Sequence, residues 1–206
     1  MQPIHDFVGE AKKQGKPFFV WYAPMMPHDP HTPPDRLLAK YTNTTDSIHV
    51  ARYRAMVEWF DETVGDLLGL LDREGLATNT IVLYVADNGW IQNPATPRYA
   101  PKSKQSQYDG GVRTPIIVRW PGRVAPRDAA EKAMSIDLMP TVLAALGLPK
   151  DAAMQGVNLL DEVAVKGRGA IFGECFTHNS VDLNRPAASL RSEEHTSELQ
   201  SRQSTS

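Results

Sequence analysis

The stretch IVLYVADNGW, residues 81–90, decides the fold class of this 206-residue chain. Its first six residues are aliphatic, β-branched or aromatic, as in strands that are buried on both faces of a parallel sheet. Asp87, Asn88 and Gly89 follow directly. Asn-Gly is a strong turn signal, because both residues accept positive φ at low cost. Ligands of open α/β sheets bind just beyond the carboxyl ends of strands, so the same residues also suit a binding site.

The rest of the chain alternates between strand and helix patterns. Residues 17–23 (PFFVWYA), 114–121 (TPIIVRWP) and 169–176 (GAIFGECF) read as short apolar strands. Residues 135–149 (SIDLMPTVLAALGLP) predict a helix that is interrupted or begun at Pro140. Apolar strands that alternate with helices predict an α/β protein, with part of a mainly parallel sheet flanked by helices.

Residues 45–75 predict one long helix. Thr45 or Asp46 would cap its start, and Gly75 follows its end, where a left-handed residue is favoured. Apolar residues recur along it at alternating steps of three and four, so we expect them to form one buried stripe. The stripe consists of Val50, Tyr53, Val57, Phe60, Val64, Leu67 and Leu71.

The composition excludes several classes of protein. With 41% hydrophobic residues, 22% charged residues and a net charge of -2, the chain is an ordinary globular sequence without the basic stripe of a nucleic-acid-binding protein. Its apolar runs stay below the roughly 18 residues of a membrane span. The N-terminal residues 1–19 lack the basic-then-apolar pattern of a signal peptide. Cys175 is the single cysteine, which excludes an intrachain disulfide.

The last 15 residues differ from the rest. Residues 192–206 (SEEHTSELQSRQSTS) contain Leu199 as their one aliphatic residue, so we expect them to be disordered. The segment resembles translated sequencing-adapter read-through, and we exclude it from the fold. Residues 1–191 are expected to form the folded portion.

Four polar residues stand out as candidates for chemistry. Asp87 and Asn88 offer the hard oxygen ligands that suit Ca²⁺ or Mg²⁺. His28 lies in a proline-rich loop, and Lys104 precedes Gly110-Gly111, a pair that lets the backbone approach another group closely. A metal and a lysine would neutralise a tetrahedral oxyanion, and a histidine would protonate a leaving oxygen. Taken singly, each of these residues also fits a solvated loop or a turn, so their order along the chain is the stronger signal.

Four blocks together resemble the second half of the catalytic domain of a type I sulfatase, in the alkaline phosphatase superfamily. The likeness covers about residues 15–191. The blocks are GKPFFVWYAPMMPHDPHTPP, VADNG, KQSQYDGGVRTPIIVRWPG and SIDLMPTVLAALG. The resemblance implies a formylglycine-dependent sulfuric ester hydrolase with an alkaline-phosphatase-like sulfatase fold. It also implies a bound Ca²⁺ or Mg²⁺, a small-molecule or glycan sulfate ester as substrate, and a periplasmic or secreted location.

The resemblance assigns roles to individual residues. The family's metal-binding Asp-Asn pair falls on Asp87 and Asn88, and its sulfate-contacting lysine falls on Lys104, four residues before Tyr108. Its catalytic histidine lies in a Pro-His-x-Pro loop, which fits both His28 and His31. We favour His28, nine residues beyond Phe19, and expect His31 to line the same pocket.

Other family features are missing from the chain. The nucleophile motif (Cys/Ser)-x-(Pro/Ala)-x-Arg does not occur, since Cys175 is followed by Phe-Thr-His-Asn. The family's paired aspartates are absent as well. Calcium prefers about six to eight oxygens, and Asp87 with Asn88 supply two or three. We therefore expect a C-terminal portion of a sulfatase that is inactive by itself and leaves an apolar flank of the sheet exposed.

Two other interpretations stay open. A phosphodiester or phosphonate monoester hydrolase of the same superfamily shares the metal-binding pattern, and an inactive truncated product would keep only the fold. Trp90 is expected to be a packing residue, with a place beside the substrate as the alternative. Glu174 and His178 are expected to pack within the fold rather than line a substrate pocket.

Overall fold

The computed structural model describes residues 1–175 and 187–191, with backbone alone for residues 173–175 and 187–191. The 192–206 segment and His178, on which the sequence made predictions, lie outside these residues. The chain divides into two compact units. The first unit comprises residues 1–80 and 92–100, and the second comprises residues 81–91 and 101–206. Each unit is described by itself.

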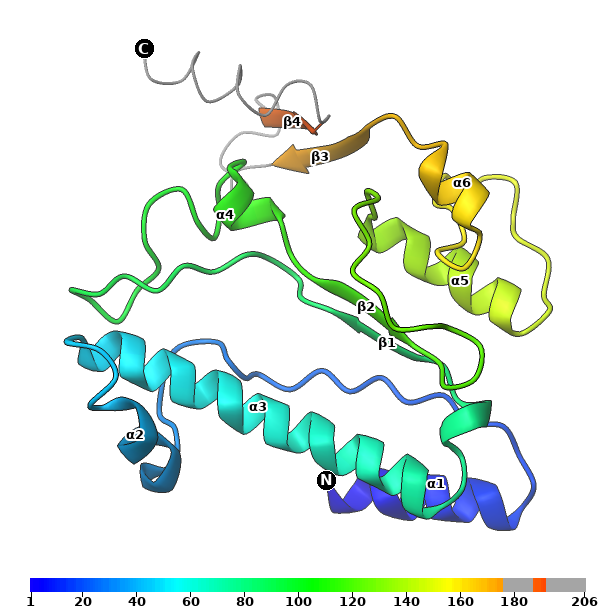
Figure 1. The fold of residues 1–206 in the computed structure, drawn as a ribbon, viewed down its shortest axis with the longest axis horizontal. Coiled ribbons are helices and arrows are strands. Elements are labelled where there is room, and N and C mark those ends of the chain that lie inside the picture. The colour runs from blue at the N-terminus through cyan, green and yellow to red at the C-terminus, as the bar shows by residue number, and fades with distance from the viewer. Residues whose placement is uncertain (176–186, 192–206) are drawn as a thin grey trace. The chain divides into compact units, whose positions relative to one another are not determined.

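Helices dominate the first unit, and both units are drawn in Figure 1. Its elements are α1 (Gln2–Lys13), α2 (Asp35–Tyr41), α3 (Ile48–Arg73) and the 3₁₀ helix η1 (Ala77–Asn79). The second unit combines short strands with short helices. Its elements are β1 (Val82–Val85), α4 (Asp109–Val112), β2 (Ile116–Arg119), the 3₁₀ helix η2 (Ser135–Asp137), α5 (Leu138–Ala145), α6 (Glu162–Lys166), β3 (Ile171–Cys175) and β4 (Ala187–Arg191).

The long predicted helix is confirmed as α3, with one correction at its start. Ser47, not Thr45 or Asp46, is the N-cap, and its hydroxyl accepts a hydrogen bond from the Val50 N–H at 3.3 Å. Beyond the helix, Gly75 adopts φ of +69°, the left-handed conformation expected there. Thr45 and Asp46 are typical capping residue types, but the position of the N-cap depends on where helical φ/ψ angles begin.

The buried face of α3 differs from the predicted stripe. The buried residues are Ala51, Ala55, Met56, Leu70 and Leu71. Of the predicted stripe, Leu71 alone is among them, and Val57 is 40% exposed. Helix α2 packs against α3 and buries its own Leu37 completely. Small alanines allow such close packing between helices, which a stripe defined by large apolar residues does not predict.

The predicted strand at residues 17–23 is an extended segment that is assigned to no ladder among the described residues. Its side chains alternate between half-buried and exposed positions, as in a strand. The exposed positions hold Phe19 (73%), Trp21 (82%) and, two steps further along, Met25 (77%). The segment thus exposes apolar side chains, while the expected exposed flank of the sheet stays a prediction.

The two strand pairs in the described residues are antiparallel, which corrects the expected mainly parallel pairing. Val82 lies opposite Arg119 and Val85 opposite Ile116, so β1 and β2 run side by side in opposite directions (Figure 1). Strands β3 and β4 pair in the same sense. A parallel pair needs a crossover that returns the chain to its starting end. The connection from β1 to β2 contains only the short helix α4, and the chain turns back instead.

The predicted helix at residues 135–149 appears as η2 followed by α5, with Pro140 in the first turn of α5, where its missing N–H leaves no helical bond unmade. Asp137 joins these two helices and is completely buried. Its carboxylate accepts hydrogen bonds from both terminal nitrogens of Arg168 at 2.6 Å and from the Met134 and Val157 N–H groups. Burial acts to raise the pKa of Asp137, but these donors outweigh it and hold the pKa below its ordinary value.

Among the described residues, every helix is too short or too polar to cross a membrane.

Candidate functional site

Asp87 and Asn88 lie just beyond β1, as predicted from the sequence. Asp87 is exposed, and its Oδ1 accepts a hydrogen bond from the Asn88 N–H at 2.9 Å. The Asn88 Nδ2 group donates to the Gly89 carbonyl at 3.0 Å, so the amide oxygen of Asn88 points away from that carbonyl. These two residues therefore form the predicted turn, and their role as metal ligands stays a prediction.

The loop at residues 86–91 is locked to the glycine pair at 110–111. The Gly89 N–H donates to the Gly111 carbonyl at 2.8 Å. A Cβ on Gly89 would lie 2.2 Å from the Gly110 carbonyl oxygen, and a Cβ on Gly111 would lie 2.3 Å from the Ser106 carbonyl oxygen. Only glycine fits such backbone approaches. The expectation that Gly110-Gly111 permits a close contact is confirmed, and the contacting segment includes the Asp-Asn turn.

Ser103 forms a second hydrogen bond to the loop at residues 86–91, and the sequence did not reveal it. Its side chain is completely buried, and its Oγ accepts a hydrogen bond from the Ile91 N–H at 2.6 Å. The Ser106 hydroxyl in turn donates to the Ser103 carbonyl at 2.5 Å. A serine between two lysines carries no sequence signal for burial, so only the fold shows this role.

Lys104 directly follows Ser103 in the chain. Its Nζ is 5.6 Å from the centroid of the Trp90 ring, a cation–π distance. Lys102, two residues earlier, lies over the Tyr108 ring at 4.7 Å. The two lysines of the PKSK sequence therefore have different aromatic partners, and Lys104 is the one associated with the segment that carries Asp87 and Asn88.

His28 lies in the first unit, and its ring orientation is fixed by Asp29. The Nδ1 atom is 2.7 Å from the Asp29 carbonyl oxygen and 2.9 Å from Asp29 Oδ1. Both oxygens are acceptors, so Nδ1 carries the proton and donates. The Nε2 atom is then the ring nitrogen suited to exchange a proton with a substrate oxygen.

His31, the second candidate in the same loop, is buried, with 7% of its surface exposed. Its ring contacts Tyr53 of α3 edge to face, with centroids 5.4 Å apart. Burial lowers the pKa of His31, against the opposing effect of the nearby Asp29 carboxylate. The His31 ring is therefore buried against a tyrosine of α3, and the choice of His28 over His31 as the catalytic histidine stays a prediction.

We expect His31 to lower the free energy of unfolding when the pH is lowered into the mildly acidic range. Because its pKa in the folded chain lies below the unfolded value of about 6.5, the unfolded chain binds more protons between these two values. Stability should therefore decrease as the pH falls through this window. Thermal unfolding of the wild type and the His31→Phe variant between pH 7.5 and 5 measures the effect. The variant should show the shallower pH dependence, and equal slopes would contradict the assignment.

The predicted residues are divided between the two units. Asp87, Asn88 and Lys104 belong to the second unit, where the contacts of Gly89 and Ser103 bring their segments together. His28 and His31 share one loop of the first unit. The structure thus assembles the two predicted ligand residues and the lysine on one framework.

The donor set at Asp87 and Asn88 fits a hard divalent cation in kind, because a carboxylate and an amide oxygen are ligands of Ca²⁺ and Mg²⁺. The described residues contain no group of three or more His, Cys, Asp or Glu side chains that could hold a metal. Asp87 and Asn88 therefore fit as part of a metal site, with further ligands required from elsewhere.

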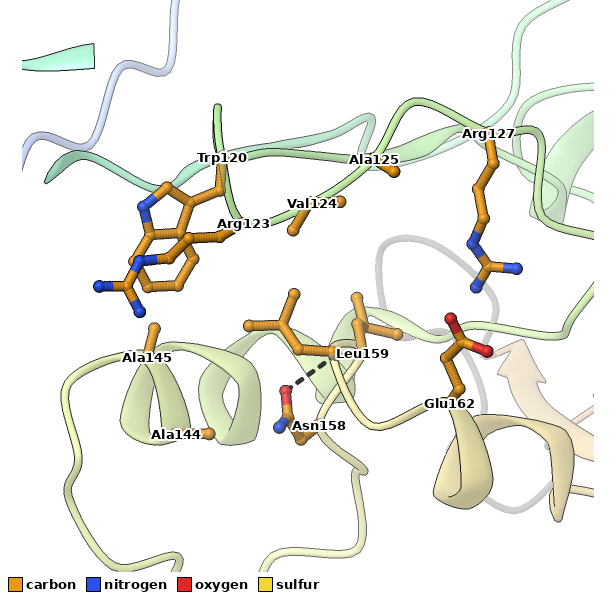
Figure 2. Close-up of a pocket in the computed structure, with 11 residues that line it drawn as sticks. Trp120, Arg123, Val124, Ala125, Arg127, Ala144, Ala145, Asn158, Leu159 and Glu162 are labelled. Carbon is orange, nitrogen blue, oxygen red and sulfur yellow. Dashed lines mark hydrogen bonds between the residues drawn. The ribbon is translucent and has the colours of Figure 1, made fainter. Parts of the chain in front are cut away.

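A cavity of about 400 Å³ lies elsewhere in the second unit (Figure 2). Arg123 lies over the Trp120 ring at 4.8 Å, and Arg127 faces Glu162 across the opening. Leucine and alanine side chains form much of the remaining wall, including Leu159. None of the predicted site residues lines this cavity.

Comparison with known proteins gives the family. The family model described as Sulfatase matches residues 1–148, and the model described as N-sulphoglucosamine sulphohydrolase, C-terminal, matches residues 102–196. The first match covers well over half of the chain. The chain belongs to the sulfatase family.

Named relatives agree with this assignment. Human arylsulfatase A is 32% identical over 166 residues, which cover 75% of this chain and 30% of that protein. The N-acetylgalactosamine-6-sulfatase of Rattus norvegicus is 31% identical over 173 residues, covering 78% of this chain and 31% of that protein. The chain thus spans about 30% of the length of these relatives.

The crystal structure of Ps i-CgsB in complex with k-i-k-neocarrahexaose matches with a TM-score of 0.78 and 23% identity. The match covers 93% of this chain and 43% of that one. The predicted α/β class and the alkaline-phosphatase-like sulfatase fold are confirmed, for a part of the domain.

Proposed function

We propose that residues 1–191 form the C-terminal portion of a sulfatase catalytic domain, and that the complete protein hydrolyses sulfate esters. One observation carries the proposal: Asp87, Asn88 and Lys104 lie on two segments that are locked together by the Gly89 and Ser103 contacts. A metal-ligand pair and a cation on one rigid framework suit the binding of a tetrahedral dianionic or monoanionic group.

The residues of this chain would divide the work as follows. Asp87 and Asn88 would hold a Ca²⁺ or Mg²⁺ ion, which supplies positive charge when bound. The Lys104 ammonium would neutralise the non-bridging oxygens of the sulfate group. His28, oriented by its Nδ1 hydrogen bonds to Asp29, would protonate the departing alcohol oxygen through Nε2. His31 would support the loop that carries His28.

The family's formylglycine would supply the nucleophile from outside this chain. Because Asp87 and Asn88 provide only part of a calcium coordination shell, we expect residues 1–191 alone to show no turnover.

A sulfated carbohydrate is the substrate class that we favour. The relative from Rattus norvegicus is named for a sulfated amino sugar, and the matching crystal structure holds an oligosaccharide. An aryl or alkyl sulfate is the alternative within the same reaction.

The test uses the full-length protein that contains residues 1–191, obtained by extending the reading frame in the source DNA. With 4-nitrophenyl sulfate as substrate, Lys104→Ala and His28→Ala should each lower kcat by about 10²-fold or more. Lys102→Ala is the matched control, since Lys102 lies over Tyr108 and should change kcat by less than about threefold.

Two results would contradict the proposal. Equal activity of Lys104→Ala and Lys102→Ala would remove the role of Lys104. Faster hydrolysis of a phosphonate monoester or a phosphodiester than of any sulfate ester would move the protein to the related phosphoryl and phosphonyl hydrolases.

A further inference from the structure

We propose that Trp90 is a positioning residue that holds the Lys104 ammonium beside the Asp87–Asn88 turn for an anionic substrate. The inference rests on the proposed role of Lys104. Trp90 follows Gly89 directly and is half-buried. The Lys104 Nζ lies 5.6 Å from its ring centroid, so the indole face attracts the ammonium through its quadrupole.

The backbone fixes both partners of this contact. The hydrogen bond from the Ile91 N–H to the buried Ser103 Oγ joins the residue after Trp90 to the residue before Lys104. On the other side of Trp90, Gly89 is bonded to Gly111. Both neighbours of Trp90, Gly89 and Ile91, are therefore held by hydrogen bonds. Lys104 follows Ser103, the partner of Ile91, so the two side chains meet without rearrangement of the backbone.

The alternative is that Trp90 only fills space. A space-filling role requires no charged partner, whereas the Trp90 ring lies 5.6 Å from the ammonium that the reaction is proposed to use. A lysine side chain has four rotatable bonds and loses much freedom when it is ordered at an anion. An aromatic face that already restrains the ammonium lowers this loss, and makes Lys104 more effective than a solvated lysine would be.

The contact can be tested without turnover in the full-length protein that contains residues 1–191, by nuclear magnetic resonance of the lysine side chains. The indole ring current should shift the Lys104 Cε protons upfield in the wild type. Trp90→Phe, which keeps an aromatic face, should retain part of the shift, and Trp90→Leu should remove it. Trp120→Leu is the matched control, because Trp120 pairs with Arg123 and not with Lys104.

The consequence for anion binding is measured by titration with inorganic sulfate, followed through the same Lys104 signals. Loss of a cation–π contact of ordinary strength corresponds to about two- to fivefold weaker binding in Trp90→Leu. Trp90→Phe should recover most of the affinity. The conservative variant also guards against misfolding of Trp90→Leu, since recovery by phenylalanine requires a folded loop.

The outcomes separate this inference from the proposed function. If the Lys104 proton shifts are the same in wild type and Trp90→Leu, or if Trp90→Phe behaves as Trp90→Leu, Trp90 does not position Lys104. If the ring-current shift is present but sulfate does not perturb Lys104, the contact stands and the sulfate-binding role proposed for Lys104 fails.

Discussion

The Asp137→Ala variant should lose about 3–5 kcal/mol of the free energy of unfolding, because removing one member of a buried ion pair leaves the other charge unpaired. Asp137 is completely buried, and the Arg168 side chain that it binds in bidentate fashion is 10% exposed. The same carboxylate also satisfies the N–H groups of Met134 and Val157. The substitution therefore leaves one cation and two backbone donors without their acceptor.

Urea denaturation followed by circular dichroism measures this loss. Glu162→Gln is the control, since Glu162 forms an exposed ion pair with Lys166 at 2.9 Å and should leave the denaturation midpoint nearly unchanged. Asp137→Asn, which keeps the size of the side chain but not its charge, should fall between the two. A midpoint for Asp137→Ala equal to that of Glu162→Gln would show that the buried pair does not support the fold.

Gly89→Ala should destabilise the chain by about 1–3 kcal/mol, the usual cost of forcing extra atoms into a packed site. Its new Cβ would lie 2.2 Å from the Gly110 carbonyl oxygen and 2.8 Å from the Gly110 carbonyl carbon. Both are backbone atoms that cannot rotate away. The segment with Asp87 and Asn88 must separate from the glycine pair, so the hydrogen bond from the Gly89 N–H to Gly111 should also break.

The same substitution at Gly65 provides a control of opposite sign. Gly65 is exposed within α3, and a Cβ there meets nothing within 4 Å. Alanine in a helix interior is favoured over glycine, so Gly65→Ala should gain about 0.5–1 kcal/mol. Thermal unfolding and hydrogen exchange of the residue 89 amide compare the two variants. Stabilisation by both alanines would mean that the two segments are not locked as the structure describes.

Periodic segments of the fold were predictable from the sequence. Residues 45–75 gave the long helix that is observed as α3 at Ile48–Arg73, since a repeat of three and four residues over many turns admits only one structure. The end at Gly75 was predictable because a left-handed residue there needs glycine. The strand before Asp87 was also confirmed, as β1 at Val82–Val85.

Features that depend on distant partners were not predictable. The antiparallel pairing of β1 with β2 depends on how the chain turns over about thirty residues of loop, which no local pattern encodes. The buried face of α3 depends on α2, a helix of seven residues that the sequence analysis missed. Ile117 and Val85 lie in predicted apolar strands but are 54% and 36% exposed, because burial depends on which other elements cover each strand.

The candidate site likewise combines residues that could be selected from the sequence with supporting contacts that could not. Asp87, Asn88, His28 and Lys104 were selected by residue type and by the resemblance to sulfatases, and they remain predictions as functional residues. Their supports were harder to foresee. Gly110-Gly111 was marked as a place of close approach, but that Gly89 approaches it, and that Ser103 is buried beside it, follows only from the fold.

The segment at residues 17–23 in the first unit limits the length of any strand that pairs with it. Pro17 and Pro24 stand at its two ends, and neither has an N–H to donate to a ladder. Regular pairing is therefore confined to the six residues 18–23, a length of about 20 Å at 3.3 Å per residue. On the exposed side of that length stand Phe19 and Trp21. The two prolines therefore limit the length over which another strand can pair with this segment, while Phe19 and Trp21 offer that strand an apolar surface.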